Sequence, residues 1–211
     1  MATQLETKGS SEIPLFGTWL KDFLRHHRSD VVVDIGSDPR LKLTLDISNY
    51  SGIVHSVNFP KDHIRMSSWH EMHQDMGVKN IQLTSGDALH LSKIVPHADV
   101  IIVKNVLLDG NKGEDTTLMW QHRRGEKECT DEEWVALLER FDQAKVDGFA
   151  EFLKVAKPGY IIRFARTDEE DSFFKMLTEK LGVDPAKIDK QQFLYDDKDK
   201  ESWEAYIIDN T

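Results

Sequence analysis

Short apolar runs recur along the chain, and most are followed by a segment with helical periodicity. Five of these runs predict strands. They span residues 31–35, 53–57, 80–84, 99–103 and 160–164. The fourth run is apolar after its first residue, which is the pattern of a central strand buried on both faces. Two later runs, 192–195 and 203–208, are separated by a charged turn and predict an antiparallel hairpin.

Apolar residues at three- and four-residue steps predict helices between the strands. The clearest helix follows Thr130, which forms a capping box with Glu133, and it ends before Pro158-Gly159. Further helices are predicted over 13–28 and over 170–181. Strands that alternate with helices imply an α/β fold with a mostly parallel sheet, wound on both faces and ending in the antiparallel hairpin.

The segment 41–47 has two interpretations. Its residues, Leu-Lys-Leu-Thr-Leu-Asp-Ile, alternate between apolar and polar, which is the period of a half-buried strand. As a strand it would turn residues 31–58 into a meander. Asp38 followed by Pro39 is instead a good N-cap and first residue of a helix, on which Leu41 and Leu45 would share a face. We favour the helix.

The length of 211 residues fits one domain with a sizeable core. We therefore predict a single domain over 1–211, with an N-terminal helical extension at 1–30 and a loop insertion at 109–130. Polar loops of that length in compact domains are usually functional or disordered. A cluster of cationic and aromatic side chains in it would suit an anionic or aromatic substrate. Its members are Trp120, His122, Arg123 and Arg124.

The formal net charge of −10 makes this an acidic protein and argues against broad nucleic-acid binding, which needs a basic face. No apolar run approaches the roughly 20 residues that span a bilayer, so we expect no membrane segment. The single cysteine, Cys129, excludes an internal disulfide and predicts a reducing, cytoplasmic setting. The histidines lack partners at metal-ligand spacing, so we expect no metal site.

Four motifs in order along the chain carry a resemblance to a known family. They are Asp34-Ile-Gly-Ser-Asp-Pro-Arg40, Ser56-Val-Asn-Phe59, Ser85-Gly-Asp-Ala-Leu89 and Val155-Ala-Lys-Pro-Gly-Tyr160. In this order the chain resembles the class I, Rossmann-like, S-adenosylmethionine-dependent methyltransferases, with a degenerate first motif. The resemblance implies S-adenosylmethionine as cofactor, bound at the carboxyl ends of the strands.

The resemblance also implies roles for individual residues. Asp34 would face the methionyl amino group of the cofactor, and Asp87 would accept a hydrogen bond from the adenine amino group. Lys104 and Asn105 would lie where methyl group and acceptor meet. The full set of implied cofactor-binding residues is Asp34, Gly36, Ser37, Asn58, Phe59, Asp87, Ala88, Lys104 and Asn105.

Two residues depart from the family pattern. Asn58 stands where the family usually has an acidic residue for the ribose hydroxyls, and Asp38 stands where many members have glycine. The residues also have structural interpretations: Asp34 would satisfy backbone amides of the next turn, Asp38 would cap a helix, and Gly86-Asp87 would be a turn that caps the following helix.

These observations leave two hypotheses for function. The first is an enzyme that transfers a methyl group from S-adenosylmethionine to an unidentified acceptor, with no catalytic residue evident because the cofactor carries the chemistry. The second is a degenerate member of the fold that has lost catalysis and binds a partner through residues 109–128. A nicotinamide-dependent dehydrogenase is disfavoured, because the glycine-rich fingerprint is missing.

Overall fold

Seven strands form one sheet in the computed structural model, which describes residues 15–36, 41–58, 60–104, 108, 110, 114–166, 170–194 and 202–211. The strands are β1 (Val31–Ile35), β2 (Ile53–Asn58), β3 (Ile81–Ser85), β4 (Val100–Lys104), β5 (Tyr160–Arg166), β6 (Ile188–Leu194) and β7 (Ser202–Asp209). Their order in the sheet is β3-β2-β1-β4-β5-β7-β6. β1 to β5 pair in parallel, and β7 runs antiparallel to both β5 and β6. The predicted fold class is therefore confirmed.

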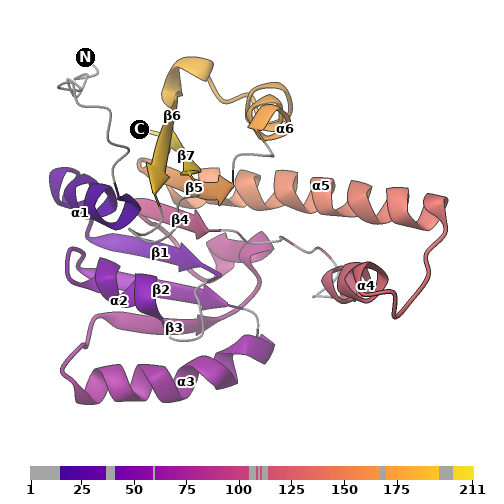
Figure 1. Cartoon of the computed structure of the whole chain (residues 1–211). Coiled ribbons are helices and arrows are strands. Elements are labelled where there is room, and N and C mark those ends of the chain that lie inside the picture. Colours follow the sequence, from indigo (N-terminus) through magenta and orange to yellow (C-terminus); the bar gives the residue numbers. More distant parts are fainter. Residues whose placement is uncertain are drawn as a thin grey trace.

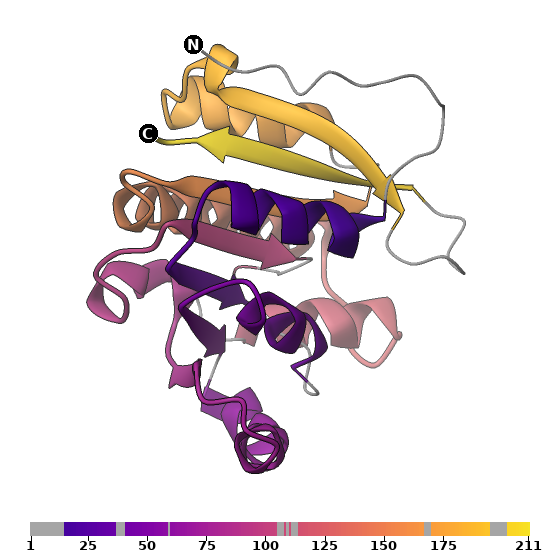
Figure 2. The ribbon, with the colours of Figure 1, turned by 90° about the vertical axis from the view of Figure 1, so that its left-hand side faces the viewer.

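Helices cover both faces and one edge of this sheet (Figure 1). The α-helices are α1 (Phe16–His26), α2 (Lys42–Ser48), α3 (Pro60–Asp75), α4 (Glu114–Arg123), α5 (Asp131–Val155) and α6 (Glu170–Lys175). Shorter helical segments are η1 (Ala88–Lys93), η3 (Met176–Lys180) and η4 (Pro185–Lys187). Figure 2 shows α3 at one edge of the sheet and the β6–β7 hairpin at the opposite edge.

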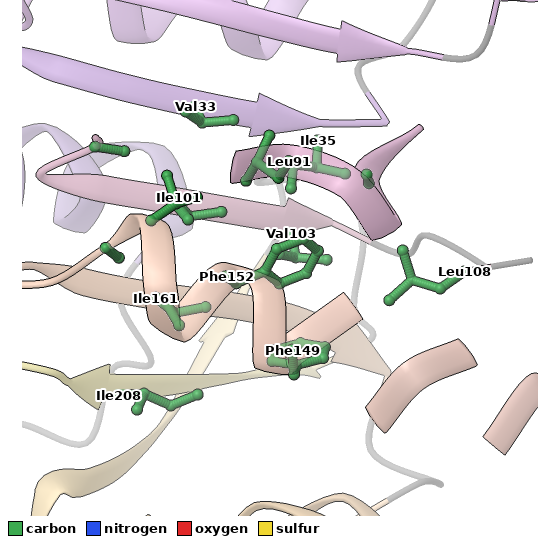
Figure 3. Packing of buried hydrophobic residues seen from close by; sticks show 14 of the residues in the cluster. Val33, Ile35, Leu91, Ile101, Val103, Leu108, Phe149, Phe152, Ile161 and Ile208 are labelled. Carbon is green, nitrogen blue, oxygen red and sulfur yellow. The ribbon is translucent and has the colours of Figure 1, made fainter. Parts of the chain in front are cut away.

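The two faces of the sheet carry separate hydrophobic clusters, because successive side chains of a strand point to opposite sides. One cluster joins the sheet to η1, α5 and α6, and the other joins it to α1 and α2. Figure 3 shows the first, with Leu91 of η1 and Phe152 of α5 beside the side chains of the central strands. Truncation of a wholly buried aromatic such as Phe152 to alanine costs about 3–5 kcal/mol.

Stacked aromatic rings hold α1 on the second face. The ring of Phe16 lies 3.9 Å, centroid to centroid, from that of Phe164 on β5, which in turn stacks at 5.0 Å on Trp203 of β7. Trp19 adds a contact with Phe193 of β6 at 4.8 Å. These contacts explain why the helix predicted over 13–28 forms at Phe16–His26.

The capping box predicted at Thr130 is confirmed. The Thr130 hydroxyl accepts from the Glu133 amide at 3.2 Å, and the Glu133 carboxylate accepts from the Thr130 amide at 2.9 Å. The helix then runs for 25 residues. At 1.5 Å per residue it is about 37 Å long, so its N-terminal half extends beyond the sheet, as Figure 1 shows.

Residues 42–48 form a helix, so the helical interpretation of this segment is confirmed and the strand interpretation is wrong. Thr44, Ile47 and Ser48 are its buried side chains, and this three- and four-residue spacing outweighs the two-residue alternation. The helix begins at Lys42, after Leu41 in the left-handed conformation with φ of 56°. Asp38 and Pro39, which we expected at its start, lie outside the described residues.

The prediction of a loop over 109–130 is wrong for residues 114–123, which form α4. The helix is held by tertiary contacts: Met119 and Leu118 pack with Leu137 and Phe141 of α5. The apolar residues of this segment, Leu118, Met119 and Trp120, are consecutive and give no helical periodicity, and this is why the sequence did not reveal the helix. The helix predicted over 170–181 is present, but its second half, η3, is π-helical.

Candidate functional site

The candidate site lies at the carboxyl ends of β1 to β4. The order β3-β2-β1-β4 places the reversal of strand order between β1 and β4, and open α/β sheets bind ligands in the crevice at this point. Two backbone hydrogen bonds join the residues that follow β1 and β3 to the carboxyl end of β2. Gly36 N donates to Val57 O at 3.1 Å, and Gly86 N donates to Asn58 O at 2.9 Å.

Asp34, the acid of the first motif, lies beneath α2. Its carboxylate oxygen Oδ2 accepts a hydrogen bond of 2.6 Å from the Thr44 hydroxyl, and both residues are 0% exposed. In the strand register Asp34 is flanked by Ser56 of β2 and Ile102 of β4, which are also fully buried. The carboxylate is therefore enclosed between the sheet and a helix.

Gly36 follows directly and has φ of 72°, a conformation that favours glycine. Its amide hydrogen bond to Val57 fixes the backbone across the end of β2. The predicted site residue Ser37 and the departure at Asp38 lie outside the described residues, as do Phe59 and Asn105.

Asn58 ends β2 and is 8% exposed. Its side-chain amide donates a hydrogen bond of 2.9 Å to the Ser56 hydroxyl, and its backbone oxygen accepts from Gly86. The amide nitrogen is thus turned toward the sheet. Among the described residues, no hydrogen bond uses its carbonyl oxygen Oδ1 or its second N–H, so both can serve a ligand.

Asp87 occupies the N-cap of η1, which confirms the prediction that Gly86-Asp87 caps the following helix. Its Oδ1 accepts from the Leu89 amide at 2.9 Å, and its side chain is half-buried. Within the part of the chain that the structure describes, no second donor contacts this carboxylate. Ala88, beside it, is buried as the first residue of η1.

A charged clamp fixes η1, and with it Asp87, to α5. The Glu151 carboxylate of α5 accepts from the Ser92 hydroxyl at 2.6 Å and from Lys154 at 2.6 Å. The hydrogen bonds from Lys154 and then Ser92 lower the pKa of Glu151 from 4.5 to about 2. Glu151 is therefore ionised at neutral pH.

Lys104 is the last residue of β4 and is half-buried. It stands two residues beyond Ile102, so it shares the face of the sheet on which Asp34 and α2 lie. Lys104 and Asp34 therefore flank the reversal point from the two central strands.

The structure divides the predicted cationic and aromatic cluster. Trp120 on α4 is 45% exposed, and the Arg123 guanidinium lies 5.7 Å from the centre of its ring. His122 is turned toward α5, where its ring lies 4.6 Å from that of Trp134. Arg124 extends into solvent near Glu126, at 3.9 Å. Only Trp120 and Arg123 thus form an exposed pair, beyond the carboxyl ends of the strands (Figure 1).

Sequence reasoning missed Thr44 and Asp115. Thr44 contacts Asp34, and Asp115 of α4 is 4% exposed and accepts two hydrogen bonds from Arg140, at 2.8 and 2.9 Å. The only sequence signal was a polar residue at a position that helical periodicity would bury. Among the described residues, no group of three or more histidine, cysteine or carboxylate side chains could hold a metal ion. No helix in this part of the chain is long and apolar enough to cross a membrane.

No family model and no curated protein sequence matches the chain. Solved structures do match. An rRNA methylase from Streptococcus thermophilus is 12% identical, with a TM-score of 0.57 over 95% of this chain and 99% of that chain. The N-methyltransferase NodS from Bradyrhizobium japonicum WM9, in complex with S-adenosyl-l-homocysteine, is 14% identical. The match has a TM-score of 0.53 and covers 90% of this chain and 84% of that chain.

NSun6 from Pyrococcus horikoshii is 15% identical, with a TM-score of 0.56 over 93% of this chain and 52% of that chain. At such identities the likeness concerns the fold. Together with the strand order, it shows that this chain has the Rossmann-like fold of the class I S-adenosylmethionine-dependent methyltransferases.

Proposed function

We propose that this protein binds S-adenosylmethionine at the carboxyl ends of β1 to β4 and transfers its methyl group to an acceptor. One observation carries the proposal: the residues that directly follow β1 and β3 are hydrogen-bonded to the carboxyl end of β2, next to the reversal of strand order between β1 and β4. This edge of the sheet carries Gly36, Asn58 and Asp87, which are residues that the family resemblance implies as cofactor contacts.

The donors and acceptors at this edge suit an adenine nucleoside. Asp87 uses one carboxylate oxygen for Leu89, so the other oxygen can accept from the exocyclic amine of adenine. The amide of Ala88 is the first of η1, a position whose N–H has no acceptor within the helix. Asn58 Oδ1 can accept from a ribose hydroxyl, as a neutral replacement for the usual carboxylate.

The acceptor side of the site would lie next to β4. Lys104 ends that strand, and the exposed pair of Trp120 and Arg123 stands on α4, the first helix after it. An exposed indole ring with a neighbouring guanidinium suits a planar or anionic acceptor. We include Ser37, Phe59 and Asn105 in the proposed site because of their positions in the sequence.

The bound cofactor supplies an electrophilic methyl group on a sulfonium. The residues of the chain then need only to hold the acceptor nucleophile in line with that group and keep water out. Positioning of this kind can supply about 7–11 kcal/mol of the barrier. This division of labour needs no nucleophile or metal from the chain, because the cofactor carries the chemistry.

The proposal can be tested by calorimetric titration with S-adenosylhomocysteine of two variants. The variants change two aspartates that have the same local geometry but lie at different places in the fold. Asp87 caps η1 and Asp184 caps η4, each by accepting from the amide two residues on, at 2.9 Å. η4 precedes β6, which runs in the same direction as β5, so Asp184 lies at the opposite end of the sheet.

We expect micromolar binding that Asp87→Asn weakens by about 30-fold, because a second amide donor then faces the adenine amine. Asp184→Asn should leave the affinity unchanged. Equal effects of the two variants would contradict the proposed adenine contact.

A non-catalytic protein of the same fold is the second candidate. Asn58 favours it, because this neutral side chain has already given its amide to Ser56. No heat and no thermal shift with millimolar S-adenosylhomocysteine would exclude the enzyme and support this alternative. The exposed pair on α4 would then be the first surface to test for a protein partner.

A further inference from the structure

A hollow of about 180 Å³ lies between α1 and α2, and none of its lining residues belongs to the proposed cofactor site. Three of the lining side chains, Leu20 and Leu24 of α1 and Ile47 of α2, are at most 3% exposed and pack with the sheet in the second cluster. Gly17 and Asn49 also line the hollow and are exposed. The hollow therefore has a buried apolar base and opens to solvent.

We propose that this hollow is a binding site for a small aromatic anion, that is, a single planar ring that carries a carboxylate or a similar acidic group. The inference goes beyond the proposed function and does not depend on it.

The size and the apolar base of the hollow are the first support. An apolar cavity of about 150 Å³ takes a ligand as large as benzene. A hollow of about 180 Å³ thus has room for one six-membered ring with a small substituent. Leu43, which is half-buried, adds a further apolar contact from α2. An apolar lining with a few polar groups at its border is typical of small-molecule sites.

Two cations at the border of the hollow determine the sign of the ligand's charge. Lys21 lines the hollow, and its ammonium nitrogen lies 5.6 Å from the centre of the Tyr50 ring. Arg25, one turn further along α1, places its guanidinium carbon 4.7 Å from the same centre. Within the described parts of the chain, no carboxylate forms an ion pair with either cation. Two neighbouring cations of this kind suit a carboxylate on the ligand.

Asp46 is the acid among the described lining residues, and it does not cancel these two charges. Burial raises the pKa of Asp46, and the neighbouring cation of Lys42 acts in the opposite direction. Lys42 thus offsets the negative charge of Asp46. Lys21 and Arg25 remain as the excess positive charge beside the hollow.

Tyr50 favours an aromatic ligand over other anions. It lines the hollow, and its amide donates to Ile47 O at 2.9 Å, which fixes the backbone of Tyr50 at the end of α2. Its half-buried ring offers an edge and a face to a second ring, and such aromatic pairs are favourable beyond the area that they bury.

The experiment titrates the ¹⁵N-labelled protein with sodium benzoate at pH 7 and follows the backbone amide shifts by NMR. Benzoate has one aromatic ring and one carboxylate, and a ligand of this size binds with a millimolar dissociation constant. We expect saturable shifts centred on Gly17, Lys21 and Tyr50. Benzyl alcohol has the same ring without the charge and should bind about tenfold more weakly, because it lacks the attraction of two partly exposed cations. Equal binding of the two probes would overturn the anionic ligand class.

Lys21→Gln should weaken benzoate binding by about threefold, which is the effect of one partly exposed cation. Arg28→Gln is the matched control, because Arg28 follows α1 directly in the chain after His27 but does not line the hollow. This control should leave the dissociation constant unchanged. Equal effects of the two variants would mean that benzoate responds only to net charge, and this would overturn the site.

Gly17→Leu blocks the hollow without removing a charge. A Cβ atom at Gly17 would meet no atom within 4 Å, and leucine is a better helix former than glycine, so the variant should fold. We expect it to abolish the benzoate shifts. Shifts that persist in this variant, or that are missing from the lining residues of the wild-type protein, would overturn the inference.

Discussion

Asp34 lies near the carboxyl end of β1 and Asp87 follows β3, so both acids lie at the same edge of the sheet, and the sequence offers a structural alternative to ligand binding for each. The structure separates them. Asp34 lies under α2 with the Thr44 hydroxyl on its carboxylate, and Asp87 is half-buried and caps η1 through one carboxylate oxygen. The comparison shows that the role of a motif residue depends on what packs over its side chain and not on its position in the motif alone.

A third carboxylate extends the comparison. Asp115 on α4 is 4% exposed and accepts hydrogen bonds from Nε and Nη2 of Arg140, whose side chain is half exposed. Asp34 and Asp115 are thus buried acids with a dedicated donor, and Asp87 is a partly exposed cap. The first two should matter most to stability, and the last should matter most to binding.

The largest effect on stability is expected from Arg140→Met. This change leaves the buried Asp115 carboxylate without its cationic partner, and breaking such a pair from one side costs about 3–5 kcal/mol. Because Arg140 is partly exposed, we expect the lower end of this range, measured by urea unfolding. Arg124→Met, which removes a solvent-exposed ion pair, should change stability by less than about 0.5 kcal/mol. A small effect of Arg140→Met would show that α4 is not held by this pair.

Thr44→Val should come next, with a loss of about 1–3 kcal/mol. Valine has nearly the shape of threonine but no hydroxyl, so the buried Asp34 carboxylate loses a donor without a change in packing. Thr44→Ser keeps the donor and should recover part of the loss. Equal stability of the valine and serine variants would show that the hydrogen bond at 2.6 Å contributes little.

Asp87→Ala removes an N-cap and should cost about 1 kcal/mol, or roughly 2–4 °C in Tm for a chain of this size. Asp184→Ala removes the equivalent cap of η4 and should have a similar effect. Thermal unfolding of both variants measures this. Only Asp87→Ala should also abolish the thermal shift that S-adenosylhomocysteine produces, so a shift that persists would contradict the proposed contact.

The smallest effect is expected at Glu151. Its pKa of about 2 in the folded protein lies below the ordinary 4.5, so its contribution to stability is present above about pH 4.5 and is lost as the pH falls toward 2. Because Lys154 is largely exposed, this contribution should not exceed about 1 kcal/mol. Urea unfolding of Glu151→Gln at pH 7 and pH 3 measures it. The difference in stability between the two proteins should be smaller at pH 3 than at pH 7, and a difference that does not change with pH would contradict the assignment.

Strands and capped helices could be predicted because their signals are local. The run at 99–103 and the capping box at Thr130 depend on residues within a few positions of one another, and both are confirmed. α4 could not be predicted, since Asp115 and Met119 become buried only by contact with α5. The cluster around Trp120 was predicted from proximity in sequence, but adjacent helical residues point about 100° apart, so His122 and Arg123 face different surroundings.

The sequence by itself determined the alternation of strands and helices, the closing hairpin and the edge at which a ligand would bind. These follow from hydrophobic period and from the rule that parallel strands place their carboxyl ends together. Only the tertiary structure decided that Asp34 is enclosed while Asp87 is reachable. That difference depends on Thr44, ten residues from Asp34, and on Glu151, far along the chain from η1. No local pattern encodes such pairs, because burial is a property of what packs on top of a residue.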